Sequence, residues 1–281
     1  MRLVKTRIDV GAGKPFRALH LSDNHLCYAD MRDGQRKVDL AGRRHAAFSR
    51  DGATPEALLN EHLTYARENG LPVLYTGDLI DFVSYQNLER AKAALDGLDY
   101  FMAVGNHEFS LYVGEAFEDV PYKMRSYDLV QSFFGNDLLF DSREMFGVNF
   151  VAVDDGYYRF DARQLERLKA EAAKGLPIVL MLHNPLHTDA LYEFMMKAQP
   201  CAYLTGTPAA MMAGYDDYRR RQQLPDEDTL AFIDYVYSQP LIRAVLVGHL
   251  HAEWEGPLPS GVMQYVADSG YHGYAREIEF I

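Results

Sequence analysis

The sequence predicts an α/β protein, because short apolar runs alternate with segments of helical periodicity along the chain. Its 281 residues are 48% apolar and 24% charged, within the range of ordinary folded domains and far from that of disordered chains. A folded chain of this length buries roughly three quarters of the surface that the unfolded chain exposes. A large hydrophobic core is therefore expected without disulfides or structural metals.

Seven apolar runs are candidate strands. Each is short and is bounded by polar, glycine or proline residues, as is typical of buried strands in α/β proteins. In chain order the candidate strands are residues 16–21, 72–76, 100–104, 148–153, 178–182, 244–247 and 261–266.

Three segments are candidate helices, because both their periodicity and their ends fit. Residues 55–69 follow Thr54, whose hydroxyl can cap the first turn, and precede Gly70, a typical residue just past a helix end. Residues 161–174 begin with Asp161, which can cap the first turn, and precede Gly175. Residues 226–238 begin in an acidic stretch, which suits the positive end of a helix dipole.

Two long segments interrupt this alternation. Residues 28–53 are rich in basic side chains and have little apolar periodicity, whereas residues 184–225 are rich in Tyr, Met and Ala and contain three consecutive arginines, 219–221. Long ordered insertions often carry function. We interpret residues 1–281 as one domain with these two insertions, the second being a candidate lid. Alternatively, residues 28–53 form a solvent-exposed surface loop without a function, and residues 184–225 simply pack against the core.

Charge and cysteine content exclude several classes of protein. With 28 basic and 40 acidic residues the net charge is -12, which disfavours nucleic acid and anionic membranes as partners. Two cysteines make no disulfide framework, and no C-x-x-C pair is present to hold zinc. The N-terminal stretch lacks the apolar core of a signal peptide, and no apolar run approaches the ~20 residues of a membrane helix. We expect a cytoplasmic protein; its oligomeric state does not follow from the sequence.

Polar residues with metal-binding side chains follow five of the candidate strands. In open α/β sheets, ligands bind beyond the carboxyl ends of the strands, so these side chains are expected to share one crevice. In strand order they are Asp23 and His25, Asp78 and Asp81, Asn106 and His107, His183, and His249 and His251.

The residue types indicate a metal site. Carboxylate, amide and imidazole donors without thiolates suit Mn, Fe, Zn or Co. The donors are too many for one catalytic ion and about right for two, which can share a carboxylate and activate a hydroxide that attacks phosphorus. Each of these groups alone is typical of a turn or a surface histidine, but five such groups at strand ends favour the metal interpretation.

These residues fall into five blocks: Asp23-x-His25, Gly77-Asp78-x-x-Asp81, Gly105-Asn106-His107-Glu108, His183 and Gly248-His249-x-His251. As a set they resemble the calcineurin-like metallophosphoesterase superfamily, whose blocks here span residues 23–251. The resemblance implies an α/β fold with a two-sheet β-sandwich flanked by helices, and ligands on loops at the C-terminal ends of strands. It also implies a hydrolase of phosphoric esters, either a phosphatase or a phosphodiesterase.

The resemblance further implies a role for each residue. A first metal ion would be held by Asp23, His25, Asp78 and His251. A second would be held by Asp78, Asn106, His183 and His249, so that Asp78 bridges two divalent or trivalent ions. His107 would act as general acid on the leaving oxygen, and Asp81 would hold and polarise the His107 ring.

Three departures from the family pattern narrow the expected substrate. Phe82 and Val104 stand where protein phosphatases of the superfamily carry phosphate-binding arginines, which argues against that activity. Asp81 stands where purple acid phosphatases have a tyrosine ligand. Glu108 and its spacing are similar to class III cyclic-nucleotide phosphodiesterases. We expect a small phosphorylated substrate, a monoester or a diester.

Other functions are less well supported. A metal-dependent nuclease would use the same site, and Arg43, Arg44 and residues 219–221 allow a local basic groove, but the net charge opposes it. A non-catalytic binding scaffold would be expected to have lost ligands, and none is missing. A phosphate-binding loop at residues 11–14 is excluded by Pro15 where Ser or Thr is required. No Gly-x-Ser-x-Gly motif supports a serine hydrolase.

Overall fold

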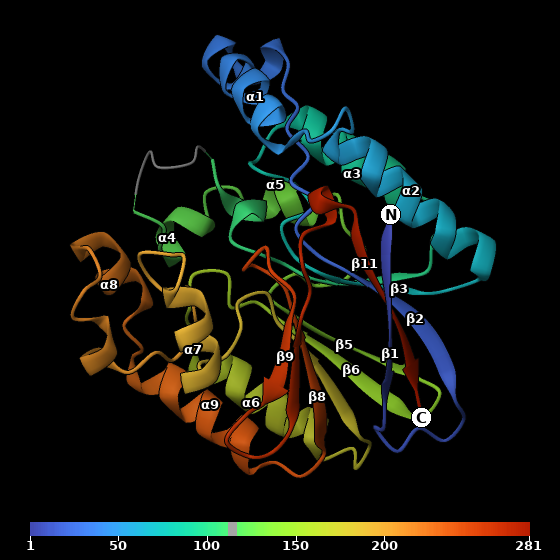
Figure 1. Cartoon of the computed structure of the whole chain (residues 1–281), viewed down its shortest axis with the longest axis vertical. Helices are drawn as coiled ribbons and strands as arrows, with labels where there is room; N and C mark the ends of the chain where they lie inside the picture. The colour runs from blue at the N-terminus through green and yellow to red at the C-terminus, as the bar shows by residue number, and fades with distance from the viewer. Residues whose placement is uncertain (112–116) are drawn as a thin grey trace.

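The computed structural model describes residues 1–111 and 117–281, which form two β-sheets packed face to face with helices on their outer faces (Figure 1). Among the described residues, the first sheet has five strands, in the order β1 (Arg2–Ile8), β11 (Tyr274–Phe280), β2 (Phe16–Leu21), β3 (Val73–Thr76) and β4 (Tyr100–Ala103). Strands β2, β3 and β4 are parallel, and β11 runs antiparallel to β2. This is the helix-flanked two-sheet sandwich that the sequence predicted.

The second sheet has six strands within the described part of the chain. In order across the sheet they are β5 (Phe140–Met145), β6 (Val148–Val153), β7 (Ile178–Met181), β8 (Ile242–Val247), β10 (Met263–Val266) and β9 (Trp254–Pro257). Strands β6, β7, β8 and β10 are parallel, and the two edge strands are antiparallel to their neighbours. Parallel strands end at one edge of the sheet, so the loops after β7 and β8 lie next to each other.

The described helices are α1 (Gln35–Phe48), α2 (Pro55–Asn69), α3 (Tyr85–Leu95), α4 (Val120–Lys123), α5 (Tyr127–Gln131), α6 (Ala162–Ala172), α7 (Asp189–Met196), α8 (Asp217–Gln223) and α9 (Glu227–Ser238). Short 3-10 helices are η1 (Met31–Asp33), η2 (His107–Phe109), η3 (Ala209–Met212) and η4 (Gly270–His272). None of the helices in the described ranges combines the length and apolar character needed to cross a membrane.

Apolar side chains fill three layers. The layer between the sheets contains Leu74 of β3, Phe150 of β6 and Val179 of β7, all fully buried. The outer face of the first sheet packs on α2 and α3, and the outer face of the second packs on α6 and α9. Because parallel strands are buried on both faces, their sequences are continuous apolar runs, which is why they were predictable.

The insertion at residues 28–53 contains a helix that the sequence did not predict. The helix α1 buries only Leu40, Ala41 and Phe48 of its fourteen residues, so its apolar periodicity is weak. Figure 1 shows α1 at the top of the molecule. The segment therefore contains an ordered helix, most of whose residues are at least partly exposed to solvent.

The buried His62 on α2 makes folding stability depend on pH. Burial lowers the pKa of His62 to about 4, outweighing nearby groups that raise it. An exposed histidine titrates near pH 6.5, so below about 6.5 the unfolded chain binds a proton that the folded chain accepts only near pH 4. The contribution of His62 to the free energy of unfolding is therefore fully present above pH 6.5. It is lost as the pH falls, and at pH 5 it is smaller by about 2 kcal/mol.

Urea unfolding of His62→Leu at pH 7 and pH 5 measures this effect. When the pH falls from 7 to 5, the free energy of unfolding should decrease by about 2 kcal/mol less in the variant than in the wild type. His45→Leu, at a partly exposed position on α1, is the matched control and should follow the wild type. An unchanged pH dependence in His62→Leu would contradict the assignment.

Candidate metal centre

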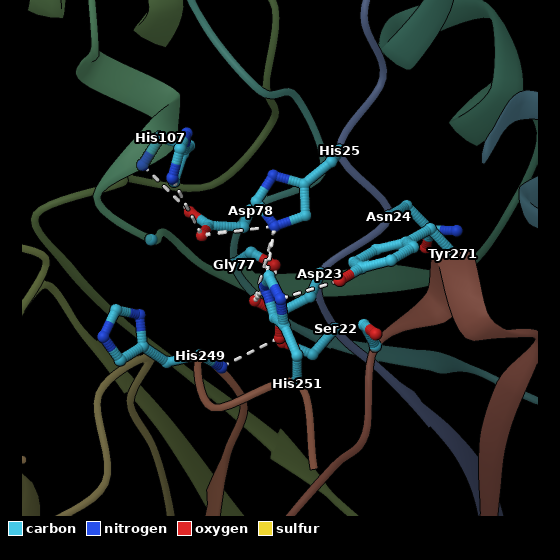
Figure 2. A network of polar contacts seen from close by, with 12 residues as sticks. Ser22, Asp23, Asn24, His25, Gly77, Asp78, His107, His249, His251 and Tyr271 are labelled. Atoms are coloured by element: carbon cyan, nitrogen blue, oxygen red, sulfur yellow. Dashed lines mark hydrogen bonds and ion pairs between the residues drawn. The ribbon is translucent and has the colours of Figure 1, made fainter. Parts of the chain in front are cut away.

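The loops after β2, β3, β4, β7 and β8 meet at one edge of the sandwich. Figure 2 shows side chains from several of these loops pointing toward one another, among them Asp23, His25, Asp78 and His251. Within the described residues, three groups of His and Asp side chains have donor atoms close enough to hold a metal ion: Asp23–His25–His251, His25–Asp78–His107, and Asp78–His183–His249. The side chains that follow the strands in the sequence thus share one crevice.

The backbone at this edge is strained. In the described ranges, nine non-glycine residues have positive φ, a conformation that is uncommon for residues with a Cβ. Seven of them lie at the site: Asp23, His25, Asp78, Tyr158, Tyr203, His249 and His251. Such strain persists only where the surrounding structure enforces it, and it is typical of functional sites.

Two glycines allow the loops to approach this closely. A Cβ on Gly105 would overlap Asp78 Oδ1, and a Cβ on Gly248 would overlap the side chains of Ser22 and Asp23. The glycines in the Gly-Asn-His and Gly-His-x-His blocks are therefore required by packing around the carboxylates rather than by a turn.

The first half of the cluster lies around Asp23. His25 Nε2 and His251 Nε2 are 3.0 Å apart, and His251 Nε2 is 3.3 Å from Asp23 Oδ1. His25 Nε2 is also 3.7 Å from Asp78 Oδ2. Asp23 Oδ1 is buried and accepts no hydrogen bond from the described residues. Two nitrogens and a free carboxylate oxygen that converge in this way fit a bound cation.

The second half lies on the other side of Asp78. His183 Nε2 is 3.1 Å from Asp78 Oδ2, and His249 Nδ1 is 3.1 Å from His183 Nε2. Asn106 Oδ1 is buried without a hydrogen-bond partner among the described residues. The carboxylate of Asp78 is therefore within 4 Å of imidazoles from both halves, as expected of a shared ligand.

The outer nitrogen of each clustered histidine is held by a hydrogen bond, an arrangement typical of metal-binding histidines because it fixes the tautomer and the ring orientation. For His25 the partner is Asp81 Oδ1 at 3.1 Å, and for His183 it is the Thr76 carbonyl at 2.7 Å. The tyrosine hydroxyls of Tyr158 and Tyr271 contact His249 Nε2 at 2.7 Å and His251 Nδ1 at 2.9 Å. All four rings thus present one nitrogen to the cluster.

Electrostatics also favours a cation at this place. Burial alone would lower the pKa of His183, but the Asp78 carboxylate raises it to about 10. The pKa of His25 is likewise raised to about 10 by Asp23 and Asp81, against the effect of burial. The carboxylates therefore attract positive charge, either as protons on imidazoles or as metal ions that replace them. The donor set fits divalent metals of the Mn, Fe, Zn and Co type.

His107 lies at the entrance of the cluster, on η2. Its Nδ1 is 2.7 Å from the main-chain carbonyl of Asp81 and 3.3 Å from Asp81 Oδ1, and its backbone N–H donates to Asp78 Oδ1 at 2.9 Å. The Asp81 residue therefore orients the ring mainly through its carbonyl. The predicted roles of His107 as acid and Asp81 as its partner remain predictions.

Arg44 was not predicted as part of the metal centre, and its basic side chain entered the sequence analysis only as part of a possible nucleic-acid groove. It comes from α1 and binds Asp81 with two hydrogen bonds, from Nε at 2.6 Å and from Nη2 at 2.7 Å. Phe48, one turn further along α1, stacks on the His25 ring with 4.6 Å between ring centroids. The insertion at residues 28–53 therefore packs directly against the cluster and compensates the buried charge of Asp81.

Removal of the Arg44 guanidinium is expected to destabilise the fold, because it leaves a fully buried carboxylate without its main counter-charge. Arg44→Met should lower the free energy of unfolding by about 2 to 3 kcal/mol, as is usual for hydrogen bonds to charged groups. Arg32→Met is the control, because Arg32 pairs with Asp30 and Glu89 at the solvent-exposed surface, where loss of an ion pair should change stability much less. Urea unfolding measures both; equal losses would contradict the role of Arg44.

Two buried acids fix the loops that carry the predicted ligands. Glu108 accepts the backbone N–H groups of Asp78 and Gly105, and burial raises its pKa to about 7. Asp155 accepts the N–H groups of His183 and Asn184 at 2.9 and 3.1 Å. Asp155 could have been singled out from the sequence, because it comes shortly after β6, just as the predicted ligands come after their strands.

A cavity of about 240 Å³ opens in front of the cluster. On one side it is lined by residues of the predicted site: Asp78, Asn106, His107, His249 and His251. On the other side it is lined mainly by residues of the second insertion, among them Met195, Gln199, Tyr203, Arg219 and Gln222. The insertion at residues 184–225 therefore forms a wall of this cavity, and it also contributes Leu191 and Leu204 to the core of the second sheet.

Comparison with known proteins identifies the family. The sequence matches the family model described as calcineurin-like phosphoesterase over residues 16–253, most of the chain. The chain belongs to the calcineurin-like phosphoesterase family. Membership of this family supports hydrolase activity on phosphoric esters, and the His and Asp groups described above are where such an enzyme can bind metal.

Solved structures agree on the fold. A dimetal phosphatase from Danio rerio is similar with a TM-score of 0.54 and 15% identity, over 91% of this chain and 88% of that chain. A purple acid phosphatase from yellow lupin (Lupinus luteus) has a TM-score of 0.57 and 13% identity, over 92% of this chain and 44% of that chain. At such identities the similarity concerns the fold alone. No curated protein sequence matches this calcineurin-like phosphoesterase.

Proposed function

We propose that the protein is a two-metal phosphoesterase that hydrolyses a small phosphomonoester or phosphodiester. The observation that carries the proposal is the convergence of predicted ligands from five strand ends, with Asp78 between the His25 and His183 imidazoles at 3.7 and 3.1 Å. Here buried acceptor atoms of Asp23 and Asn106 have no hydrogen-bond partner among the described residues.

In this proposal each metal ion has four ligands and the ions share one. The first site consists of Asp23, His25, Asp78 and His251, and the second of Asp78, Asn106, His183 and His249. Bound divalent ions lower the pKa of water and polarise phosphoryl oxygens, which is the chemistry that ester hydrolysis at phosphorus requires. The identity of the ions, Mn, Fe, Zn or Co, is tested by the metal content of the purified protein.

In this proposal, side chains of the protein itself deliver a proton to the leaving oxygen. His107 Nδ1 faces the Asp81 carbonyl, so Nε2 is the ring atom that faces the cavity and can carry a proton to the leaving oxygen. Asp81, whose carboxylate is held by Arg44, keeps the His107 ring in place. A positioned acid of this kind is most valuable when the leaving group is a poor one, such as an alkoxide.

We also propose that the insertion at residues 184–225 selects the substrate. Its residues Tyr203 and Arg219 line the cavity opposite His107, whereas Leu191 and Leu204 are buried in the core. Point variants of cavity residues are thus a better test than deletion of the segment, which would remove core side chains.

An activity screen tests the proposal. The protein is stripped of metal, loaded separately with Mn, Fe, Zn and Co, and assayed against phosphomonoesters, cyclic and linear phosphodiesters, pyrophosphates and single-stranded nucleic acid. Hydrolysis of a small mono- or diester is the expected result. Cleavage of nucleic acid in preference to small esters would favour the nuclease alternative, and absence of hydrolysis with every metal would contradict the proposal.

A further inference from the structure

The charge on the walls of the cavity is unevenly distributed. Its described lining includes the carboxylates Asp78 and Glu118, and Arg219 is the one Lys or Arg side chain among the described lining residues. Glu118 accepts hydrogen bonds from Ser110 and from Gln222 at 3.0 Å each, so its oxygens are already engaged. Among the described lining residues, one Lys or Arg side chain therefore faces the metal centre, from the wall that the second insertion provides.

The guanidinium of Arg219 is held in place by uncharged groups. Nη1 donates to Gln222 Oε1 at 3.0 Å, and the guanidinium carbon lies 5.1 Å from the Tyr203 ring centroid and 5.4 Å from that of Tyr218. Within residues 1–111 and 117–281, no carboxylate lies within ion-pair distance of Arg219, and Nε and Nη2 donate to no acceptor. Tyr203 in turn packs edge-on against the His249 ring, at 6.1 Å between centroids, which ties Arg219 to the cluster.

The two following arginines are placed differently. Arg220 forms an ion pair with Asp217, and the Arg221 guanidinium carbon lies 3.9 Å from the Phe117 ring centroid. Neither lines the cavity in front of the cluster; both contribute to a separate depression with Leu224. Of the three consecutive arginines, Arg219 alone has a guanidinium that faces the predicted metal site without a carboxylate partner in the described residues.

A partly buried cation without a counter-charge is costly unless a ligand supplies the negative charge. The planar guanidinium binds phosphate or carboxylate through paired N–H groups, and two such donors of Arg219 are unused. We propose that Arg219 is a substrate-recognition residue that binds an anionic group of the phosphorylated substrate. The group is either the phosphoryl group at the metal centre or a second anion on the leaving group. This inference rests on the proposed function in one respect, namely that the substrate is a phosphorylated compound.

Calorimetric binding to the dialysed, Mn-loaded protein tests the inference without turnover. The probes are inorganic phosphate, which has one anionic group, and phosphonoacetate, whose carbon–phosphorus bond resists hydrolysis and whose carboxylate adds a second anion. Arg219→Gln should weaken binding of at least one probe by about 10- to 100-fold, as expected for a lost charge-assisted hydrogen bond. Arg219→Lys should retain part of the affinity, because it keeps the charge but not the paired donors.

Arg220→Gln is the matched control and should bind both probes as the wild type does. Metal content and thermal unfolding of each variant show whether the fold and the metal centre are intact. If Arg219→Gln weakens the binding of both probes equally, Arg219 contacts the phosphoryl group at the metal centre. If only the binding of phosphonoacetate is weakened, Arg219 contacts a second anionic group. Unchanged affinity for both probes in Arg219→Gln, or no binding of either by the wild type, would overturn the inference. If the activity screen showed no hydrolysis but the probes still bound in a way that depends on Arg219, the proposed function would be refuted and the role of Arg219 in binding anions would stand.

Discussion

Removal of divalent metal is expected to abolish hydrolysis of an aryl phosphate, and addition of Mn²⁺ to the stripped protein is expected to restore it. Two common alternatives to a metal-dependent nucleophile are not supported: the sequence contains no Gly-x-Ser-x-Gly elbow, and both cysteines are buried. Burial raises the pKa of the Cys27 thiol far above its usual value, so that Cys27 does not form a thiolate. In the proposed mechanism, loss of the ions therefore removes the activation of the attacking water.

The experiment compares p-nitrophenyl phosphate turnover before chelation, after chelation and dialysis, and after titration with Mn²⁺. Circular dichroism of the stripped protein serves as the control for folding. Turnover that persists in the fully stripped, folded protein would rule out metal-dependent hydrolysis.

The second large effect is expected for His107→Ala, which should lower kcat by about 10²- to 10⁴-fold for an alkyl phosphate, the usual contribution of a positioned general acid. The effect should shrink for p-nitrophenyl phosphate, whose leaving group needs little protonation. Metal content should not change, because His107 is proposed to act on the leaving oxygen and not as a ligand.

Steady-state kinetics on the two esters, together with metal analysis, separates these roles. His187→Ala is the control, since His187 lies outside the cluster and pairs with Asp189. If His107→Ala lost metal, or lost activity equally on both esters, the assignment of His107 as acid would be wrong.

The central strands of both sheets could be predicted because they are buried on both faces and so have uninterrupted apolar sequences. The edge strand β1 and its neighbour β11 escaped prediction because charged residues are frequent in them, as in Arg2–Ile8 and Tyr274–Phe280. In β11 the buried Arg276 is compensated by Glu253 and Glu255, partners more than 20 residues away in the sequence. Such pairing is set by tertiary structure, which local patterns do not contain.

The predicted ligands came from a local signal, a polar residue directly after an apolar strand. Arg44, Tyr158 and Arg219 carry no such signal, because they reach the site from a helix or a loop whose position depends on the whole fold. The three consecutive arginines at 219–221 were visible in the sequence, but only the orientation of α8 separates Arg219 from Arg220.

Metal stoichiometry is the most direct test of the proposed centre. Mass spectrometry of the dialysed, Mn-loaded protein should give two ions per chain in the wild type and in His107→Ala. Asp78→Asn should lose metal from both sites, because Asp78 lies between the His25 and His183 imidazoles and is proposed to serve both ions. A wild-type protein that binds a single ion, or an Asp78→Asn variant that keeps one site full, would contradict a two-metal centre bridged by Asp78.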